Sequence, residues 1–250
     1  MTAAVGCFLG VSLAQSTDAV ALQKAYGEFQ RESQQVNPNY RPQSVNTDGW
    51  DATQQAWKAL FPQITIVRCF LHTVLSIQQV CLRSSEAFKL VTDKLWHLYH
   101  SLNRQQFAQR LRRLVEWAKR TDNDLADKAQ QKLLTLPHKA DQLKATFDLP
   151  QAYRTSNQVD RLMNYQDRIL YAMQYFHGTL NAAKQGLRAM ALLWNFHPYC
   201  HKVQAMEPHS MSPFEDLKRF RYHKDWLRNF LNASVLQGRG TGKQIKHQLE

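Results

Sequence analysis

Strand-like apolar segments alternate with amphipathic helical segments over residues 1–80, and this alternation is the strongest constraint on the fold. The expected elements are a buried strand at 3–14, a helix from about Asp18 to Val36, a short strand ending at Asp48, a helix through Trp57 and Phe61, and a strand at 64–70. Strands that alternate with helices in this way predict an α/β layered sheet.

Residues 71–147 carry no strand signal, and large apolar residues recur there at helical spacing. Further helices are expected at about 157–176, at 179–195 after Gly178, and around Trp226. We therefore expect four parts: a sheet portion at 1–80, an all-helical insertion at 81–150, two core helices within 151–200, and a basic C-terminal tail at 201–250.

The chain has 250 residues with a formal net charge of +12, which favours a polyanionic partner because Lys and Arg neutralise phosphates and release counterions. DNA is the expected partner. The four cysteines form no disulfide framework of a small secreted domain, so the reducing cytoplasm fits best. The first sixteen residues lack the Lys or Arg of a signal peptide, and no apolar stretch approaches the length of a membrane span, so no membrane partner is expected.

Asp48 has two readings. It precedes Gly-Trp-Asp-Ala and could be the N-cap of the following helix. Alternatively, a carboxylate at the end of a strand is well placed to hold a divalent metal ion. Asp51 is expected to be a surface acid that the helix dipole favours.

Asp160 lies near the start of the helix expected at 157–176. Asn164 and Asp167 follow at positions i+4 and i+7, so the three side chains share a stripe, and Arg161 and Arg168 directly follow the two acids. The helix could be a solvated, salt-bridged face. Alternatively, Asp160 is a metal ligand and the arginines contact the phosphate backbone; Asp167 is the other candidate for the acid.

Cys69 and His72 form a Cys-x2-His pair that permits three interpretations. They could combine with His197 and Cys200 into a Cys2His2 zinc site of a zinc-stabilised module. They could be an ordinary buried thiol and imidazole. In the third interpretation, His72 braces a nearby acidic site through a hydrogen bond.

Taken together, three segments resemble bacterial insertion-sequence transposases of the DDE/D group, of the Mutator-related type. The segments are Asn46-Thr47-Asp48-Gly49-Trp50, Cys69-Phe70-Leu71-His72, and Thr155-Ser156-Asn157-Gln158-Val159-Asp160-Arg161-Leu162. They occur in the family's order, and the resemblance extends from Ala3 to about Tyr199. Asp48 matches the family's second acid, Cys69 and His72 match its C/D-x2-H motif, and Asp160 falls at its third acid.

The resemblance implies an RNase H-like mixed sheet with a large all-helical insertion, and two Mg²⁺ or Mn²⁺ ions held by three carboxylates. Such enzymes cleave the phosphodiester at the ends of a mobile element and join the 3′ end to target DNA. The implied partners are transposon-end and target DNA and, in an intact enzyme, a second copy, in a prokaryotic cytoplasm at the nucleoid. The candidate DNA contacts are basic side chains: Arg112, Arg113, Arg154, Arg161 and Arg168.

One departure from the family affects activity. The family's first acid lies on a first strand upstream of the segment that here begins at Met1, and neither Asp18 nor Asp51 reads as a strand residue that could replace it. We therefore expect an incomplete sheet without the first strand and first acid, and a chain that is weak or inactive alone. The alternative is a non-catalytic DNA-binding remnant that regulates transposition.

Overall fold

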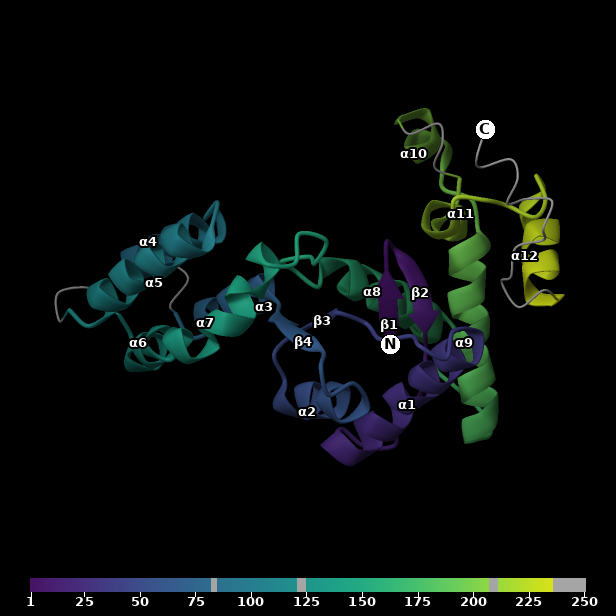
Figure 1. The fold of residues 1–250 in the computed structure, drawn as a ribbon, viewed down its shortest axis with the longest axis horizontal. Coiled ribbons are helices and arrows are strands. Elements are labelled where there is room, and N and C mark those ends of the chain that lie inside the picture. The colour runs from purple at the N-terminus through teal and green to yellow at the C-terminus, as the bar shows by residue number, and fades with distance from the viewer. Residues whose placement is uncertain (82–84, 121–124, 207–210, 236–250) are drawn as a thin grey trace. The chain divides into compact units, whose positions relative to one another are not determined.

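The computed structural model describes residues 1–81, 85–120, 125–206 and 211–235, and is mainly helical with two two-stranded sheets (Figure 1). The chain forms two compact units. The first, here the hairpin unit, comprises Met1–Gln15, Ala25–Glu32 and Gln158–Glu250; the second, here the parallel-strand unit, comprises Ser16–Lys24 and Ser33–Asn157. The end of the expected basic tail, from 236, lies outside the described residues.

The hairpin unit begins with an antiparallel pair, β1 (Thr2–Ala4) and β2 (Cys7–Gly10). The prediction of one strand over residues 3–14 is wrong, because Val5 (φ 50°) and Gly6 (φ 72°) reverse the chain. Positive φ at both central residues matches the twist that a two-residue hairpin needs. Valine rarely adopts a positive φ, so no turn was predicted at this position.

Helices α8 (Asn157–Ala172) and α9 (Leu180–Phe196) supply the core under this hairpin. Phe8, Leu162 and Ala191 are buried together, and Trp194 packs edge-on against Phe8. Asn195 both accepts a hydrogen bond from the N–H of Phe8 and donates one to its carbonyl, each at 2.8 Å, so its amide continues the ladder of β2. Helix α8 ends four residues earlier than the expected Phe176.

The hairpin unit continues with α10 (His201–Met206), α11 (Pro213–Lys218) and α12 (Trp226–Val235). A second apolar cluster joins the end of α9 to α11 and α12. Phe196 stacks on Phe214, with ring centroids 4.3 Å apart, and Ala233 of α12 is buried in the same cluster. Ser212 caps α11 by accepting a hydrogen bond from the N–H of Glu215.

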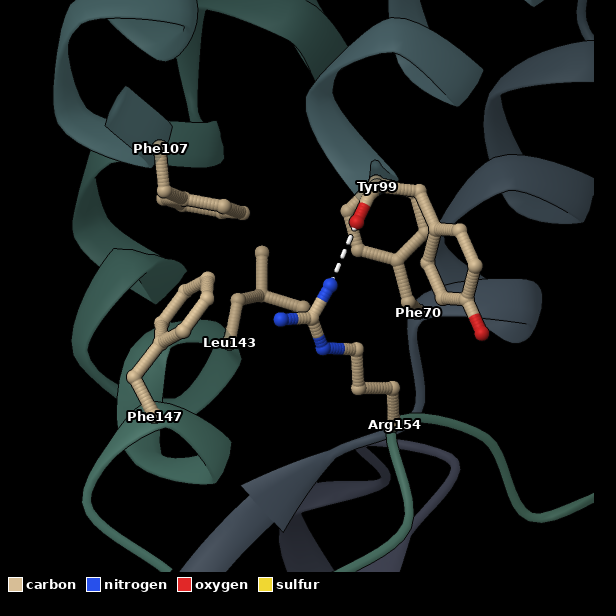
Figure 2. A pocket seen from close by; sticks show the side chains of 6 residues that line it. All are labelled: Phe70, Tyr99, Phe107, Leu143, Phe147 and Arg154. Carbon is tan, nitrogen blue, oxygen red and sulfur yellow. Dashed lines mark hydrogen bonds between the residues drawn. The ribbon is translucent and has the colours of Figure 1, made fainter. Parts of the chain in front are cut away.

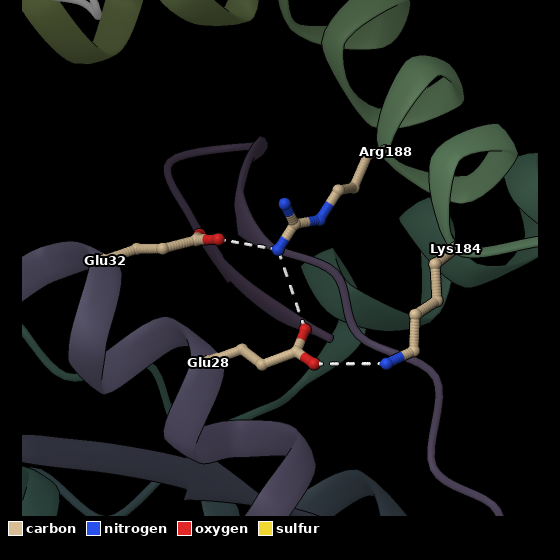
Figure 3. Close-up of polar contacts among 4 residues, drawn as sticks. All are labelled: Glu28, Glu32, Lys184 and Arg188. Atoms are coloured by element: carbon tan, nitrogen blue, oxygen red, sulfur yellow. Dashed lines mark hydrogen bonds and ion pairs between the residues drawn. The ribbon is translucent and has the colours of Figure 1, made fainter. Parts of the chain in front are cut away.

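Helix α1 (Ala19–Val36) begins as expected after Asp18, whose carboxylate accepts a hydrogen bond from the N–H of Ala21 at 2.9 Å. Its portion within the hairpin unit is joined to α9 by ion pairs (Figure 3). Glu28 pairs with Lys184 at 3.3 Å, and Arg188 pairs with Glu28 at 3.6 Å and with Glu32 at 2.6 Å.

The parallel-strand unit contains β3 (Ser44–Thr47), α2 (Asp51–Leu60) and β4 (Thr65–Arg68). The two strands pair in parallel, with Ser44 opposite Thr65 and Thr47 opposite Arg68. A parallel pair needs a crossover, and α2 provides it. This strand–helix–strand order is as predicted, although β3 ends at Thr47 instead of Asp48 and β4 is shorter than the expected 64–70.

The helical block predicted at 71–147 is confirmed in its described residues. Its helices are α3 (Phe70–Gln78), α4 (Glu86–Tyr99), α5 (Arg104–Ala118), α6 (Asp127–Leu134), α7 (Leu136–Lys144) and the 3₁₀ turn η1 (Ala145–Phe147). Val91, Leu95, Leu98 and Leu133 are at most 1% exposed in one apolar cluster of this block, and α7 packs against β4. Within the described residues, the helices are too short or too polar to cross a bilayer.

Candidate functional site

Asp48 directly follows β3 at the carboxyl end of the parallel pair. Its side chain is exposed, and Oδ1 accepts a hydrogen bond from the N–H of Trp50 at 2.9 Å. The N-cap of α2 is Trp50, so the interpretation of Asp48 as the N-cap is wrong. The carboxylate of Asp48 instead accepts from the N–H two residues later and forms an Asx turn just before the helix. Asp51 lies in the first turn of α2, where the helix dipole favours it, as expected.

Arg68, at the end of β4, underlies the turn that follows Asp48. Its Nη2 donates to the carbonyl of Gly49 at 3.0 Å, and its Nε donates to Oε1 of Gln142 on α7 at 3.2 Å. Burial lowers the pKa of Arg68, while the charges of Asp51 and Asp48 act in the opposite direction. The candidate acid Asp48 therefore interacts electrostatically with the partly buried guanidinium of Arg68, which its hydrogen bonds hold in place.

The Cys-x2-His pair contacts the segment that leads into α8. Cys69 is fully buried; its N–H donates to the carbonyl of Thr47 at 2.7 Å, and its Sγ accepts the N–H of Ser156 at 3.1 Å. The hydroxyl of Ser156 lies 3.1 Å from Nδ1 of His72. His72 therefore contacts the residue that precedes α8, and its role as a brace for an acidic site stays a prediction.

Two further contacts hold this lead-in against the strands. The side-chain amide of Asn46, on β3, donates to the carbonyl of Tyr153, and the N–H of Phe70 donates to the carbonyl of Arg154 at 2.9 Å. Residues 153–156 therefore run beside the end of β3 and the start of α3. All three sequence motifs meet at this lead-in, with Asp48, the Cys-x2-His pair and Ser156 in the parallel-strand unit.

Arg154 lines a small pocket in the parallel-strand unit together with Phe70, Tyr99, Phe107, Leu143 and Phe147 (Figure 2). Its guanidinium donates to the carbonyls of Tyr99 and Ser101 and lies 4.5 Å from the ring centroid of Phe147. The carbonyl of Tyr99, the last residue of α4, and the carbonyl of Ser101 just after the helix thus accept from a charged donor. Arg154, a candidate DNA contact from sequence, is engaged inside its own unit.

The second candidate acid, Asp160, lies in the first turn of α8, in the hairpin unit. It is half-buried, whereas Asp167 is exposed; Arg161 and Arg168 are also exposed, and Nε of Arg168 donates to the carbonyl of Asn164. Asp48 and Asp160 belong to different units. The choice between Asp160 and Asp167 stays a prediction.

On α5 of the parallel-strand unit, Arg112 and Arg113 are exposed. Arg112 pairs with Glu116 at 3.6 Å. Two neighbours of the same basic run are also engaged: Arg104 pairs with Asp148, and Arg110 donates to the carbonyl of His97. The run is therefore partly neutralised within its own unit.

The implied Mg²⁺ or Mn²⁺ ions were tested against the donors present. Carboxylate oxygens are the right ligand type for these hard cations. However, no group of three or more His, Cys, Asp or Glu residues within 1–81, 85–120, 125–206 and 211–235 is arranged to hold a metal ion. These residues do not form the three-carboxylate site that the resemblance implies, and we assign no reaction step to a metal.

Sequence reasoning did not single out Ser156, Arg68 or Gln142 as site residues. Ser156 was considered only as part of the Thr155-Ser156-Asn157 segment before the helix. Its hydrogen-bond partners, Cys69 and His72, are more than eighty positions away in the sequence. Arg68 directly precedes Cys69 in the sequence, so a basic residue at the end of a strand was an available signal.

Comparison of the chain with protein-family models, with curated protein sequences and with solved structures gives no significant match.

Proposed function

We propose that this chain is part of the catalytic core of a DNA transposase, of the Mutator-related insertion-sequence type, and that it binds DNA. The observation that carries the proposal is the contact of Ser156 with both Cys69 and His72. Two motifs separated by more than eighty residues in the sequence meet there, next to the strand that leads to Asp48. Motifs that serve one site are expected to converge in this way.

The order of elements also supports the proposal. An antiparallel hairpin, a helix, a parallel strand pair, a helical block and α8 follow one another along the chain. The same order follows the first strand of an RNase H-like sheet with a helical insertion. Asp48 after β3 and the Cys-x2-His pair after β4 then occupy the family's positions for the second acid and the C/D-x2-H motif.

DNA binding is the activity that the charge of this chain supports most directly. The net charge of +12 favours a phosphate backbone, and exposed arginines on α5 and α8 offer contacts. Asp48 and Asp160, which belong to different units, are the carboxylates that we expect divalent cations to contact.

The proposal is tested by titrating the full chain with Mn²⁺ and, separately, with duplex DNA at several salt concentrations. We expect salt-dependent DNA binding, and Mn²⁺ binding that Asp48→Asn and Asp160→Asn each weaken. Asp167→Asn, on the same helix as Asp160, is the matched control and should leave Mn²⁺ binding unchanged.

Four other outcomes would change or refute the assignment. DNA binding with no Mn²⁺ binding would favour the non-catalytic regulator. Loss of Mn²⁺ binding in Asp167→Asn but not in Asp160→Asn would make Asp167 the third acid. Mg²⁺-dependent nicking of DNA that disappears in Asp48→Ala would show that the chain cleaves DNA by itself, and absence of DNA binding would refute the proposal.

A further inference from the structure

The turn between α8 and α9 holds two consecutive non-glycine residues in the left-handed region of the backbone. Gln174 has a φ of 54° and Tyr175 has a φ of 68°. The N–H of Tyr175 donates to the carbonyl of Leu170 at 2.7 Å. The N–H of Gln174 donates to the carbonyl of Tyr171 at 3.1 Å. These two bonds form a Schellman motif, in which glycine usually takes the left-handed position. A residue with a Cβ is strained in this conformation, and such strain is often found where a ligand binds.

Contacts with α9 hold this turn in place. The ring of Phe176 lies against Gly186, where a Cβ would be 2.9 Å from the ring carbon Cε1. Thr179 is the N-cap of α9, and its hydroxyl accepts a hydrogen bond from the N–H of Ala182 at 3.2 Å. The turn is therefore tied to two helices of the hairpin unit, and its outward side chains project from a defined backbone.

Three large side chains of the segment 171–175 face solvent. Tyr171 is 76% exposed, Tyr175 is 62% exposed and Met173 is 52% exposed. Single apolar side chains are common on a protein surface, whereas several together mark a binding site. A phenol ring has a flat face that stacks on a nucleotide base, and only two side-chain torsions have to be fixed for it. The two tyrosines are therefore suited to an aromatic ligand.

Two arginines of α8 lie on the same stripe of the helix as Tyr171. Arg161, Arg168 and Tyr171 are separated by seven and three positions, which places them on one face. Both arginines are exposed, and the acids Asp160 and Asp167 lie on the neighbouring stripe. Proteins that bind single-stranded nucleic acid combine cationic groups for the phosphates with aromatic rings for the bases. This face of α8 and the turn after it offer that combination.

We propose that Tyr171 and Tyr175 stack on unpaired bases of single-stranded DNA, with Arg161 and Arg168 against its phosphates. The inference rests on the proposed DNA-binding function and deepens it, since it names unpaired nucleotides as the ligand of the hairpin unit. The bases inside a duplex are covered by their neighbours, so a duplex offers these rings no base to stack on. A second copy of the chain is a weaker candidate for this surface, because both copies carry the net charge of +12.

The test compares Tyr171→Leu and Tyr175→Leu with Tyr171→Phe and Tyr175→Phe in the full chain. Leucine removes the aromatic face and keeps apolar bulk, whereas phenylalanine keeps the ring, so the Phe variants are the matched controls. Affinity is measured in EDTA for an oligothymidylate, which forms no secondary structure, and for a relaxed circular duplex, which has no unpaired ends. We expect each Leu variant to bind the single strand about fivefold or more weakly, because it loses the stacking of one base. The Phe variants should bind the single strand like the wild type, and all four variants should bind the duplex alike.

A second measurement uses the wild-type chain and so does not depend on the folding of a variant. Single-stranded DNA that carries iododeoxyuridine is irradiated in complex with the chain, because this base cross-links to aromatic rings that stack on it. Trypsin cleaves after Arg168 and Lys184, so the peptide 169–184 contains both tyrosines. Mass spectrometry should find the nucleotide adduct on this peptide. Adducts confined to other peptides would overturn the inference.

The outcomes separate this inference from the proposed function. Duplex binding, together with equal single-strand affinities of the Leu and Phe variants, overturns the stacking and leaves DNA binding standing. Absence of binding to both forms of DNA overturns the inference and the proposed function together. A dimer that the Leu variants dissociate, without any loss of single-strand affinity, would assign the turn to a second copy of the chain and overturn the contact with bases.

Discussion

The hydroxyl oxygen of Ser156 and Nδ1 of His72 lie 3.1 Å apart, although 84 positions separate the two residues in the sequence. The N–H of the same serine donates to Cys69, so both residues of the Cys-x2-His pair engage the residue that precedes α8. The N–H of Ser156, next to the first turn of α8, thus donates to the buried sulfur of Cys69. The motif therefore holds Ser156, the residue that precedes α8, within the parallel-strand unit.

Ser156→Ala removes the hydroxyl but keeps the N–H that Cys69 accepts. We expect the variant to lose about 1 kcal/mol of unfolding free energy, because a buried side-chain hydrogen bond contributes about that much. Urea unfolding of Ser156→Ala, His72→Ala and the double variant gives the coupling energy between the two side chains. A coupling near zero would mean that the two groups do not interact. Ser234→Ala, at an exposed position of α12, controls for the loss of a serine hydroxyl.

Gly49→Ala should destabilise the parallel-strand unit. Gly49 has a φ of 94°, and a Cβ there would lie 2.0 Å from Nη1 of Arg68. We expect backbone strain of about 1–3 kcal/mol, and in addition roughly 1 kcal/mol as Arg68 gives up its hydrogen bonds. In an Arg68→Met background the alanine meets no guanidinium, so the same glycine change should cost only the strain. Equal costs in the two backgrounds, measured by urea unfolding, would contradict the close approach.

Local signals predicted much of the fold, and long-range contacts account for what they missed. Asp18 and Thr179 were visible as helix starts because a cap acts within a few residues. The β1–β2 turn was missed because its first residue is Val5, which turn chemistry does not favour. The start of α8 was placed correctly, but the partners of Ser156 depend on tertiary structure, which no local pattern encodes.

Arg154 shows the same limit at a candidate site residue. Its sequence context, just before the third motif in a basic chain, suggested a phosphate contact. Its guanidinium instead binds the carbonyls of Tyr99 and Ser101 and lies against Phe147. The sequence shows that a residue is charged, but the tertiary contacts of its side chain decide whether it can bind a phosphate.

Arg154→Ala should therefore affect stability. Hydrogen bonds from a charged donor contribute about 1.5–3 kcal/mol, and the two carbonyls that lose their donor lie in a partly buried position. We expect a loss of about 2–3 kcal/mol in urea unfolding. Arg113→Ala, at an exposed position on α5, should change unfolding by less than about 0.5 kcal/mol. If the two variants unfold alike while Arg154→Ala alone weakens DNA binding, the guanidinium serves DNA rather than the fold.

The ion pairs between α1 and α9 should make the hairpin unit sensitive to acid. Burial alone would raise the pKa of Glu28, but hydrogen bonds from Ser12 and Lys184 and the charges of Lys184 and Arg188 outweigh it, so the pKa lies below its ordinary value of 4.5. A carboxylate with a lowered pKa stabilises the folded state above its ordinary pKa. That stability is lost as the pH falls through the lower, folded-state value.

Glu28→Gln tests this linkage. The variant should be less stable than the wild type at neutral pH, and the difference should shrink as the pH falls below 4.5, because the wild-type carboxylate then becomes protonated. Thermal unfolding at a series of pH values measures it. Glu86→Gln, which removes an exposed pair with Lys89, should give little difference at any pH. A gap between Glu28→Gln and the wild type that stays constant from neutral to acidic pH would show that packing, and not the charge of Glu28, holds α1 against α9.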